Sequence, residues 1–236
     1  MSMALGGRPA GRALPPAILC IGRNYGAHAA EMGAERPERP MVFAKNPAAV
    51  VGDGEAIVIP PICREHGPQV DFEGEIAVVI GPEDVRDVPR DRALDAVAGY
   101  AAANDVSARW WQKEGAGGQF VRGKSFDTFC PLGPIVPAAE APDPGRLEIR
   151  TVVSGEPMQH GRASDMLFPV AELVAELSRG TTLLAGTVLL TGSPSGVGHA
   201  RTPPRYLADG DEVVVTLELD GRELSRVRSP VVEPAG

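Results

Sequence analysis

Short apolar runs and alternating apolar and polar residues fill most of the chain, and this pattern predicts many short β-strands. The strand candidates are Ile18–Ile21, Met41–Lys45, Ala56–Ile59, Val70–Gly81, Val97–Ala108, Leu147–Ser154, Val188–Leu190, Glu212–Asp220 and Glu223–Val232. One amphipathic helix is expected at Pro169–Arg179, where apolar residues recur every three or four positions. The pattern therefore predicts a β-rich α+β protein with two or three short helices.

The strand candidate Val70–Gly81 reads V-D-F-E-G-E-I-A-V-V-I-G. Because side chains alternate along a strand, Asp71, Glu73 and Glu75 would project from one face. Ionised carboxylates are costly to bury unpaired, so a partly buried row of three predicts a divalent metal ion. Gly74 removes bulk from the opposite face, which favours close approach by another segment. The alternative is an acidic, solvated strand edge.

A further carboxylate, Asp105, stands near the end of the strand candidate Val97–Ala108. At the end of that strand it would meet Glu73 and Glu75 around one ion. The alternative is that Asp105 caps the segment that begins at Ser107.

A histidine and a glutamate lie three residues apart in the alanine-rich stretch after the first strand. On a short helix His28 and Glu31 would be neighbours, so that the carboxylate orients the imidazole and raises its basicity. The following segment, Gly33–Pro40, has the composition of a mobile loop, which predicts that this helix lies on a lid. The alternative is an ordinary surface pair.

Three further features carry candidate chemistry. Arg109 and Gln112 would share one face of a short helix over Ser107–Glu114. Lys124 stands among apolar residues and turn formers, which suits a cation that meets a carboxylate or an oxyanion; a solvated surface lysine is the alternative. The glycine-rich loop Thr191–Gly198 offers backbone N–H groups and hydroxyls to an anion.

Length and charge narrow the class of protein. The 236 residues favour one domain over residues 18–232, preceded by a flexible segment over residues 1–17. The net charge of −8 disfavours nucleic acid and anionic membranes as partners and favours small molecules. Three widely spaced cysteines give no evident zinc site and fit a reducing cytoplasm. No apolar run reaches the ~18 residues needed to span a bilayer.

Five motifs, in order, resemble the fumarylacetoacetate hydrolase family, particularly its short, single-domain members that act on acylpyruvates or oxaloacetate. They are G-R-N-Y-G-A-H-A-A-E-M, D-F-E-G-E, N-D-V-S-A-R, G-K-S-F-D-T-F-C-P-L-G-P and L-T-G-S-P-S-G-V-G. The resemblance covers roughly residues 18 to 230. It implies the β-roll fold of the fumarylacetoacetase C-terminal domain, in a protein that is usually a homodimer.

The resemblance also implies roles for individual residues. It implies a metal site of Glu73, Glu75 and Asp105, a general base of His28 with Glu31, a catalytic Lys124, and substrate contacts from Arg23, Arg109, Gln112 and Thr191. One departure is visible, because Trp110 follows Arg109 where family members often have an acidic residue. The departure removes an acidic neighbour that could orient Arg109.

The activity implied is hydrolysis of a C–C bond in an acylpyruvate, such as fumarylpyruvate or acetylpyruvate, with Mg²⁺ or Mn²⁺ and release of pyruvate. His28 would deprotonate the attacking water, and Lys124 would stabilise the oxyanion. The same site would serve an oxaloacetate decarboxylase or an isomerase or decarboxylase of 2-hydroxy-diene-dioates. A catalytically silent protein that binds a dicarboxylate is the alternative from another class.

Overall fold

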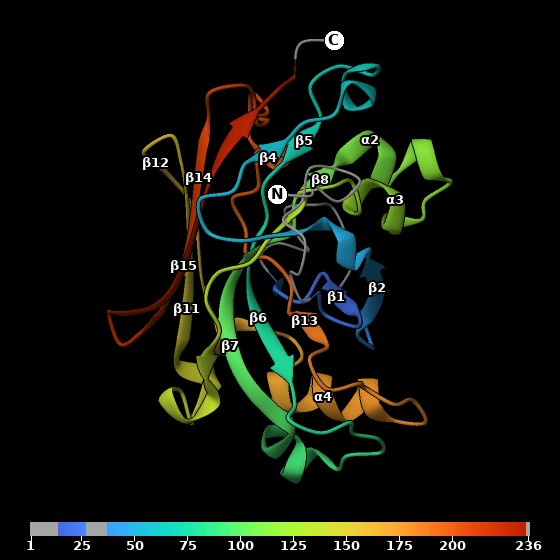
Figure 1. The fold of residues 1–236 in the computed structure, drawn as a ribbon, viewed down its shortest axis with the longest axis vertical. Coiled ribbons are helices and arrows are strands. Elements are labelled where there is room, and N and C mark those ends of the chain that lie inside the picture. The colour runs from blue at the N-terminus through green and yellow to red at the C-terminus, as the bar shows by residue number, and fades with distance from the viewer. Residues whose placement is uncertain (1–13, 27–36, 235–236) are drawn as a thin grey trace, which may run out of the picture.

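Two β-sheets packed face to face form the body of the structure (Figure 1). This computed structural model describes residues 14–26 and 37–234. The six-stranded sheet has the order β10 (Val136–Pro137), β7 (Val97–Asn104), β6 (Gly74–Ile80), β13 (Val188–Leu190), β1 (Ile18–Gly22), β2 (Met41–Lys45). The five-stranded sheet has the order β12 (Glu156–Arg162), β11 (Leu147–Val153), β14 (Glu212–Leu219), β15 (Arg222–Val232), β4 (Ile57–Val58). Two short pairs complete the strands, β3 (Val50–Val51) with β9 (Cys130–Pro131) and β5 (Val70–Asp71) with β8 (Ser107–Ala108).

Helices are few and short, as the sequence predicts. The described α-helices are α2 (Arg109–Gln112), α3 (Phe120–Lys124) and α4 (Val170–Ser178). Short 3-10 segments lie at Pro47–Ala49, Pro61–Arg64, Arg90–Ala96, Glu114–Ala116, Ala138–Glu140, Pro144–Arg146, Ala163–Asp165 and Gly198–Ala200. Helix α4 confirms the amphipathic pattern, because Val170, Leu173 and Val174 are buried. In the described part of the chain, no helix has the length and apolar character needed to span a membrane.

Strand β6 is buried on both faces, which explains its continuous apolar sequence. Ile76, Val78 and Ile80 belong to the core between the two sheets, together with side chains of β11, β14 and β15. Ala77 and Val79 pack into a second cluster on the opposite face. Each fully buried Val or Ile side chain contributes about 1.5–3 kcal/mol to the free energy of unfolding. The strand that carries the acidic residues is therefore among the most firmly held in the structure.

The expectation of one continuous strand over Val70–Gly81 is wrong. The chain is interrupted at Phe72–Glu73, and the expected strand Val97–Ala108 is interrupted opposite, at Asp105 and Val106. Two hydrogen bonds hold the break: the Asp105 N–H donates to the Glu73 carbonyl at 2.8 Å, and the Glu73 N–H donates to Asn104 Oδ1 at 2.9 Å. The regular ladder is therefore interrupted at the acidic residues, and Asp71 and Glu73 on either side of the break both bind the guanidinium of Arg109.

Gly74 lies on β6 directly against side chains of the five-stranded sheet. A Cβ added there would lie 2.0 Å from Thr151 Oγ1 on β11 and 3.2 Å from Val215 Cγ1 on β14. The prediction that a neighbouring segment approaches Gly74 is therefore confirmed. The residues of the expected N-terminal segment 1–17 lie mostly outside the described part of the chain, and the single domain over residues 18–232 stays a prediction.

A Gly74→Ala substitution should lower the free energy of unfolding by roughly 1–3 kcal/mol, since the added methyl must displace Thr151 in a packed core. Urea denaturation measures the change. Gly26→Ala is the matched control, because its added Cβ would meet, among the described residues, only Leu167 Cδ2 at 3.6 Å. Equal stability of the two variants would contradict the close packing described here.

Candidate active site

Three carboxylates converge at the break between β6 and β7. One oxygen from each of Glu73, Glu75 and Asp105 lies within 4.8 Å of the others, and all three residues are buried. Glu75 is the second residue of β6, Glu73 precedes that strand, and Asp105 follows β7. The sequence placed these three residues around one point, and the structure brings them together. Asp105 does not act as a helix cap, because Lys45 and Lys124 bind its carboxylate oxygens at 2.6 Å.

The charges around these residues do not balance. Lys124 and Arg109 bind Glu73 at 2.6 and 2.5 Å. Glu75 instead accepts a hydrogen bond from the Gly192 N–H at 2.7 Å and, within the described part of the chain, forms no ion pair. Burial, with the charges of Asp105 and Glu73 added, raises the pKa of Glu75 well above its ordinary value. Four buried carboxylates, with Asp71 included, thus face three buried cations.

A divalent cation fits this donor set. Clustered carboxylate oxygens are the ligands that hard ions such as Mg²⁺ and Mn²⁺ prefer, whereas zinc sites usually contain nitrogen or sulfur. A charge of +2 would turn the excess negative charge into an excess positive charge, which suits an anionic substrate. Glu73, Glu75 and Asp105 are the residues that would hold the ion.

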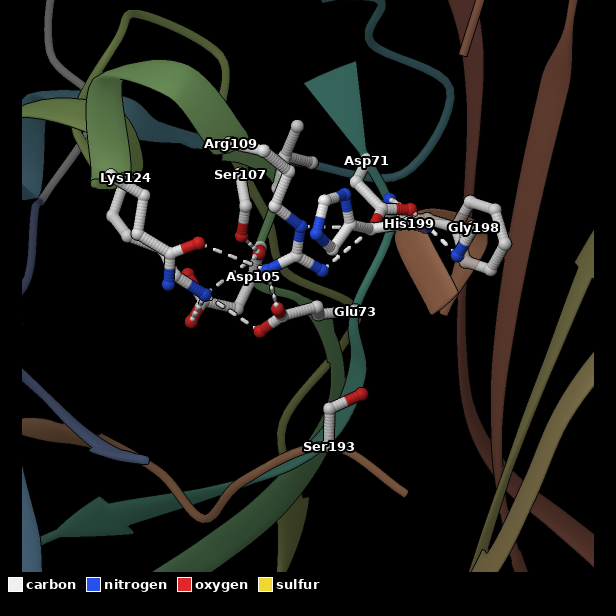
Figure 2. Close-up of polar contacts among 12 residues, drawn as sticks. Asp71, Glu73, Asp105, Ser107, Arg109, Lys124, Ser193, Gly198 and His199 are labelled. Atoms are coloured by element: carbon white, nitrogen blue, oxygen red, sulfur yellow. Dashed lines mark hydrogen bonds and ion pairs between the residues drawn. The ribbon is translucent and has the colours of Figure 1, made fainter. Parts of the chain in front are cut away.

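Arg109, the first residue of helix α2, is held in place by the carboxylate of Asp71 on strand β5. Its Nε and Nη2 atoms donate to Asp71 Oδ2 at 2.9 and 2.6 Å (Figure 2). Its Nη1 donates to Gln112 Oε1 at 3.0 Å. Burial would lower the pKa of Arg109, but Asp71 and Glu73 outweigh it and raise the pKa. Asp71 supplies the acidic partner that is missing next to Arg109 in the sequence. The prediction that Arg109 and Gln112 are neighbours is confirmed.

Asp71 in turn is held by backbone N–H groups. Gly198 donates to its Oδ1 at 2.8 Å and His199 to its Oδ2 at 3.0 Å, on the side of Asp71 away from Lys124 (Figure 2). The expected anion-binding character of the loop Thr191–Gly198 is therefore present. Within the described structure, these loop N–H groups bind the protein's own carboxylates, Glu75 and Asp71.

Lys124 is not a surface lysine. Its side chain is 1 % exposed, and Nζ lies 2.6 Å from both Glu73 and Asp105. Burial would lower the pKa of Lys124, but Asp105 and Glu73 outweigh it, so the pKa lies above the ordinary value and the ammonium stays charged at neutral pH. The sequence predicts this lysine as a cation that meets a carboxylate, and the contacts agree.

A cavity of about 220 Å³ opens beside the carboxylates. The described residues that line it are Ile21, Gly22, Arg23, Met41, Phe43, Glu73, Glu75, Arg109, Gln112, Lys113, Phe120, Lys124 and Ser193. Arg23, Arg109 and Gln112 line this cavity, and their contact with a substrate stays a prediction. Thr191 does not line the cavity, because its buried hydroxyl donates to the Ile76 carbonyl at 2.9 Å.

Two residues beside the site were missed at the sequence level. Lys45 is a buried lysine at the end of the apolar strand β2, a position that could have marked it as the partner of a buried carboxylate. Ser193 lines the cavity, and its hydroxyl donates to the Gly74 carbonyl at 3.2 Å. No local pattern distinguishes Ser193 from other loop serines. His28 and Glu31 lie outside the described residues, so their pairing stays a prediction.

Comparison with known proteins bears out the resemblance. Residues 17–232 match the family described as fumarylacetoacetate (FAA) hydrolase C-terminal. The chain is 47% identical over 204 residues to oxaloacetate tautomerase YisK of Bacillus subtilis. The matched region covers 85% of this chain and 66% of that protein. The chain thus spans just under two thirds of the length of this curated relative.

Solved structures share the fold. The 5-carboxymethyl-2-hydroxymuconate delta-isomerase of Mycobacterium smegmatis superposes with a TM-score of 0.79 at 39% identity, over 94% of this chain and 81% of that one. A fumarylacetoacetate hydrolase of Exiguobacterium antarcticum superposes with a TM-score of 0.81 at 40% identity, over 94% of this chain and 76% of that one. The predicted β-roll fold is therefore confirmed, and the chain belongs to the fumarylacetoacetate hydrolase family of enzymes.

Proposed function

We propose that this protein is a divalent-metal-dependent enzyme that interconverts the enol and keto forms of a 2-oxo acid of the oxaloacetate class. The observation that carries the proposal is the 47% identity to an oxaloacetate tautomerase over 85% of this chain. The buried carboxylates beside Lys124 and Arg109 support it, because tautomerisation requires stabilisation of negative charge on a 2-oxo acid. The similarity to a delta-isomerase points to the same class of proton transfer.

Hydrolysis of an acylpyruvate, the activity expected from the sequence, is the second candidate. The 40% identity to a fumarylacetoacetate hydrolase favours it. Both reactions form an enolate of a 2-oxo acid, so the same acidic cluster suits either one. They differ in whether a water attacks a second carbonyl carbon or a proton is simply moved.

Glu73, Glu75 and Asp105 are the proposed metal ligands, and Mg²⁺ or Mn²⁺ is the proposed ion. When bound, the ion supplies Lewis-acid stabilisation of charge on the 2-oxo acid oxygens. A bound ion would stabilise the ionised form of Glu75 most, because Glu75 is buried and has no cationic partner among the described residues.

The cationic side chains provide the remaining stabilisation. In tautomerisation the enol O–H loses a proton and carbon 3 gains one. The enolate between these two proton transfers carries negative charge on its oxygen. Lys124 carries a charged ammonium at the cavity wall and is the proposed N–H donor to that oxygen. Arg109, clamped by Asp71, adds positive charge and holds Glu73 in place. His28, with Glu31, is the proposed group that moves the proton at carbon 3.

The first test follows the ultraviolet absorbance of enol-oxaloacetate. The purified protein should accelerate its decay, EDTA should remove the acceleration, and added Mg²⁺ or Mn²⁺ should restore it. Pyruvate release from acetylpyruvate, measured with a coupled lactate dehydrogenase, reports the hydrolase instead. Metal-dependent pyruvate release without enol decay would overturn the tautomerase proposal in favour of the hydrolase.

A second test concerns the metal ligands. Glu75→Gln should weaken Mn²⁺ binding by more than the roughly 10–100-fold typical of changes outside the ligand shell. Isothermal titration calorimetry measures the affinity, and circular dichroism checks the fold. Glu114→Gln is the matched control, because it removes the same charge from an exposed position outside the acidic cluster. Unchanged Mn²⁺ affinity in Glu75→Gln would show that the ligands are misassigned.

A further inference from the structure

A second cavity, of about 580 Å³, lies between residues 67–70 and 204–208 and is called the β5 groove below. It shares no described lining residue with the cavity at the acidic cluster. Its walls are largely apolar and include Ile59, Val70 and Leu207, and the Leu207 N–H donates to the Val70 carbonyl at 2.8 Å. A concave, mostly apolar space of this size is typical of sites for small molecules.

Gln69 brings an unpaired hydrogen-bond donor to the wall of the β5 groove. The residue is 4 % exposed, and its Oε1 accepts a hydrogen bond from the Trp110 N–H at 3.1 Å. The other end of the amide, Nε2, has no hydrogen-bond partner among the described residues. Buried amide N–H groups nearly always have an acceptor, because burial without one is costly. An oxygen atom of a molecule in the groove would supply that acceptor.

The charged groups along the β5 groove are already paired with one another. Arg64 binds Glu233 at 2.7 Å, and Arg205 binds Asp211 at 2.5 Å. Since each guanidinium has a carboxylate partner of the protein's own, the groove has no unpaired cation that calls for an anion. Its apolar walls also disfavour a charged group. The groove therefore suits an uncharged molecule that offers a carbonyl oxygen.

Gln69 also holds the start of helix α2. Its backbone carbonyl accepts a hydrogen bond from the Arg109 N–H at 2.9 Å, in addition to the bond between its Oε1 and the Trp110 N–H. Arg109 in turn lines the cavity at the acidic cluster. One residue thus connects the wall of the β5 groove to the helix that carries Arg109 into the candidate active site.

Tyr206 makes a second connection of the same kind. Its hydroxyl lies 2.7 Å from His199 Nδ1, and His199 Nε2 lies 3.4 Å from the ammonium of Lys113, which lines the cavity at the acidic cluster. Burial, with the charges of Arg109 and Lys113 added, lowers the pKa of His199, which favours the neutral imidazole. A neutral imidazole accepts from the ammonium at Nε2 and donates from Nδ1 to Tyr206. Both connections end on residues 109–113.

We infer that the β5 groove is a second ligand site, which takes an uncharged, largely apolar molecule whose carbonyl oxygen accepts a hydrogen bond from Gln69 Nε2. Its occupant alters the position of α2, because Gln69 is bonded both to the ligand and to that helix. Ligands at two coupled sites change each other's affinity by the same factor, so the groove would regulate the candidate active site. The inference goes beyond the proposed function and does not depend on which reaction the acidic cluster serves.

Tryptophan fluorescence tests the inference, because both tryptophans of the chain, Trp110 and Trp111, lie on α2. The probe is 4-phenylbutan-2-one, and 3-phenylpropanoate is its counterpart of the same shape with a carboxylate in place of the methyl ketone. The ketone should change the fluorescence saturably, and calorimetry should give the same Kd. The carboxylate should bind at least about 10-fold more weakly, because its charge would enter an apolar groove without a free cation.

Two variants locate the site. Gln69→Glu keeps an acceptor for the Trp110 N–H and removes the free N–H donor, so it should weaken binding of the ketone at least about 5-fold. Ala208→Phe should abolish binding by filling the groove, since Ala208 is an exposed residue of its wall. Ala139→Phe is the matched control, because Ala139 is exposed and lies outside the groove. Circular dichroism checks that each variant folds.

Absence of saturable binding of the ketone to the wild-type protein would overturn the inference and would leave water as the partner of Gln69 Nε2. Equal affinity in the wild type and in Ala208→Phe would place the ketone elsewhere and would also overturn it. Binding heat without a fluorescence change would contradict the coupling to α2. Neither readout requires a metal ion or catalysis, so a failure of the proposed function leaves the test of the groove unaffected.

Discussion

The structure around the cavity depends on the compensation of buried negative charge. Burying a carboxylate is costly unless a cation or several hydrogen-bond donors accompany it. Here Asp105 is bound by Lys45 and Lys124, and Glu73 by Arg109 and Lys124. These cations come from β2, α2 and α3, so the electrostatic requirement of the acidic residues ties separate parts of the chain to one point.

The break in the β6 and β7 strands creates this requirement. A regular ladder would alternate its side chains and would leave Glu73 and Asp105 free to face away from each other. The interruption, held by the Asp105 N–H and the Asn104 side chain, directs both carboxylates toward Glu75. The firmly packed remainder of β6 supplies a rigid support. A buried cluster of like charges is typical of a functional site, because such a site sacrifices stability for chemistry.

Sequence reasoning identified the acidic cluster because its members carry a local signal. Glu73 and Glu75 are two residues apart on an apolar strand, and Asp105 ends another. Alternation placed Asp71 beside Glu73, and both do bind the guanidinium of Arg109, but this shared partner, 38 residues from Asp71, was not predicted. Lys45 was missed for a similar reason: its partner is 60 residues away. Pairings over such distances depend on tertiary packing that no local period encodes.

The order of the elements and the amphipathic helix α4 were likewise readable, because hydrophobic periodicity reports burial directly. The direction of the Thr191 side chain, in contrast, could not be predicted from the sequence. Its hydroxyl satisfies a backbone carbonyl of β6, and the neighbouring Ser193 lines the cavity in its place.

We propose above all that Glu73, Glu75 and Asp105 together hold a divalent cation at the base of the cavity. A crystal structure of the protein grown with Mn²⁺ and oxalate, analysed by anomalous scattering at the manganese edge, tests it most directly. We expect a single strong anomalous peak within about 2.0–2.4 Å of a carboxylate oxygen from each of the three residues. A peak bound elsewhere, or none at these carboxylates at saturating Mn²⁺, would contradict the account.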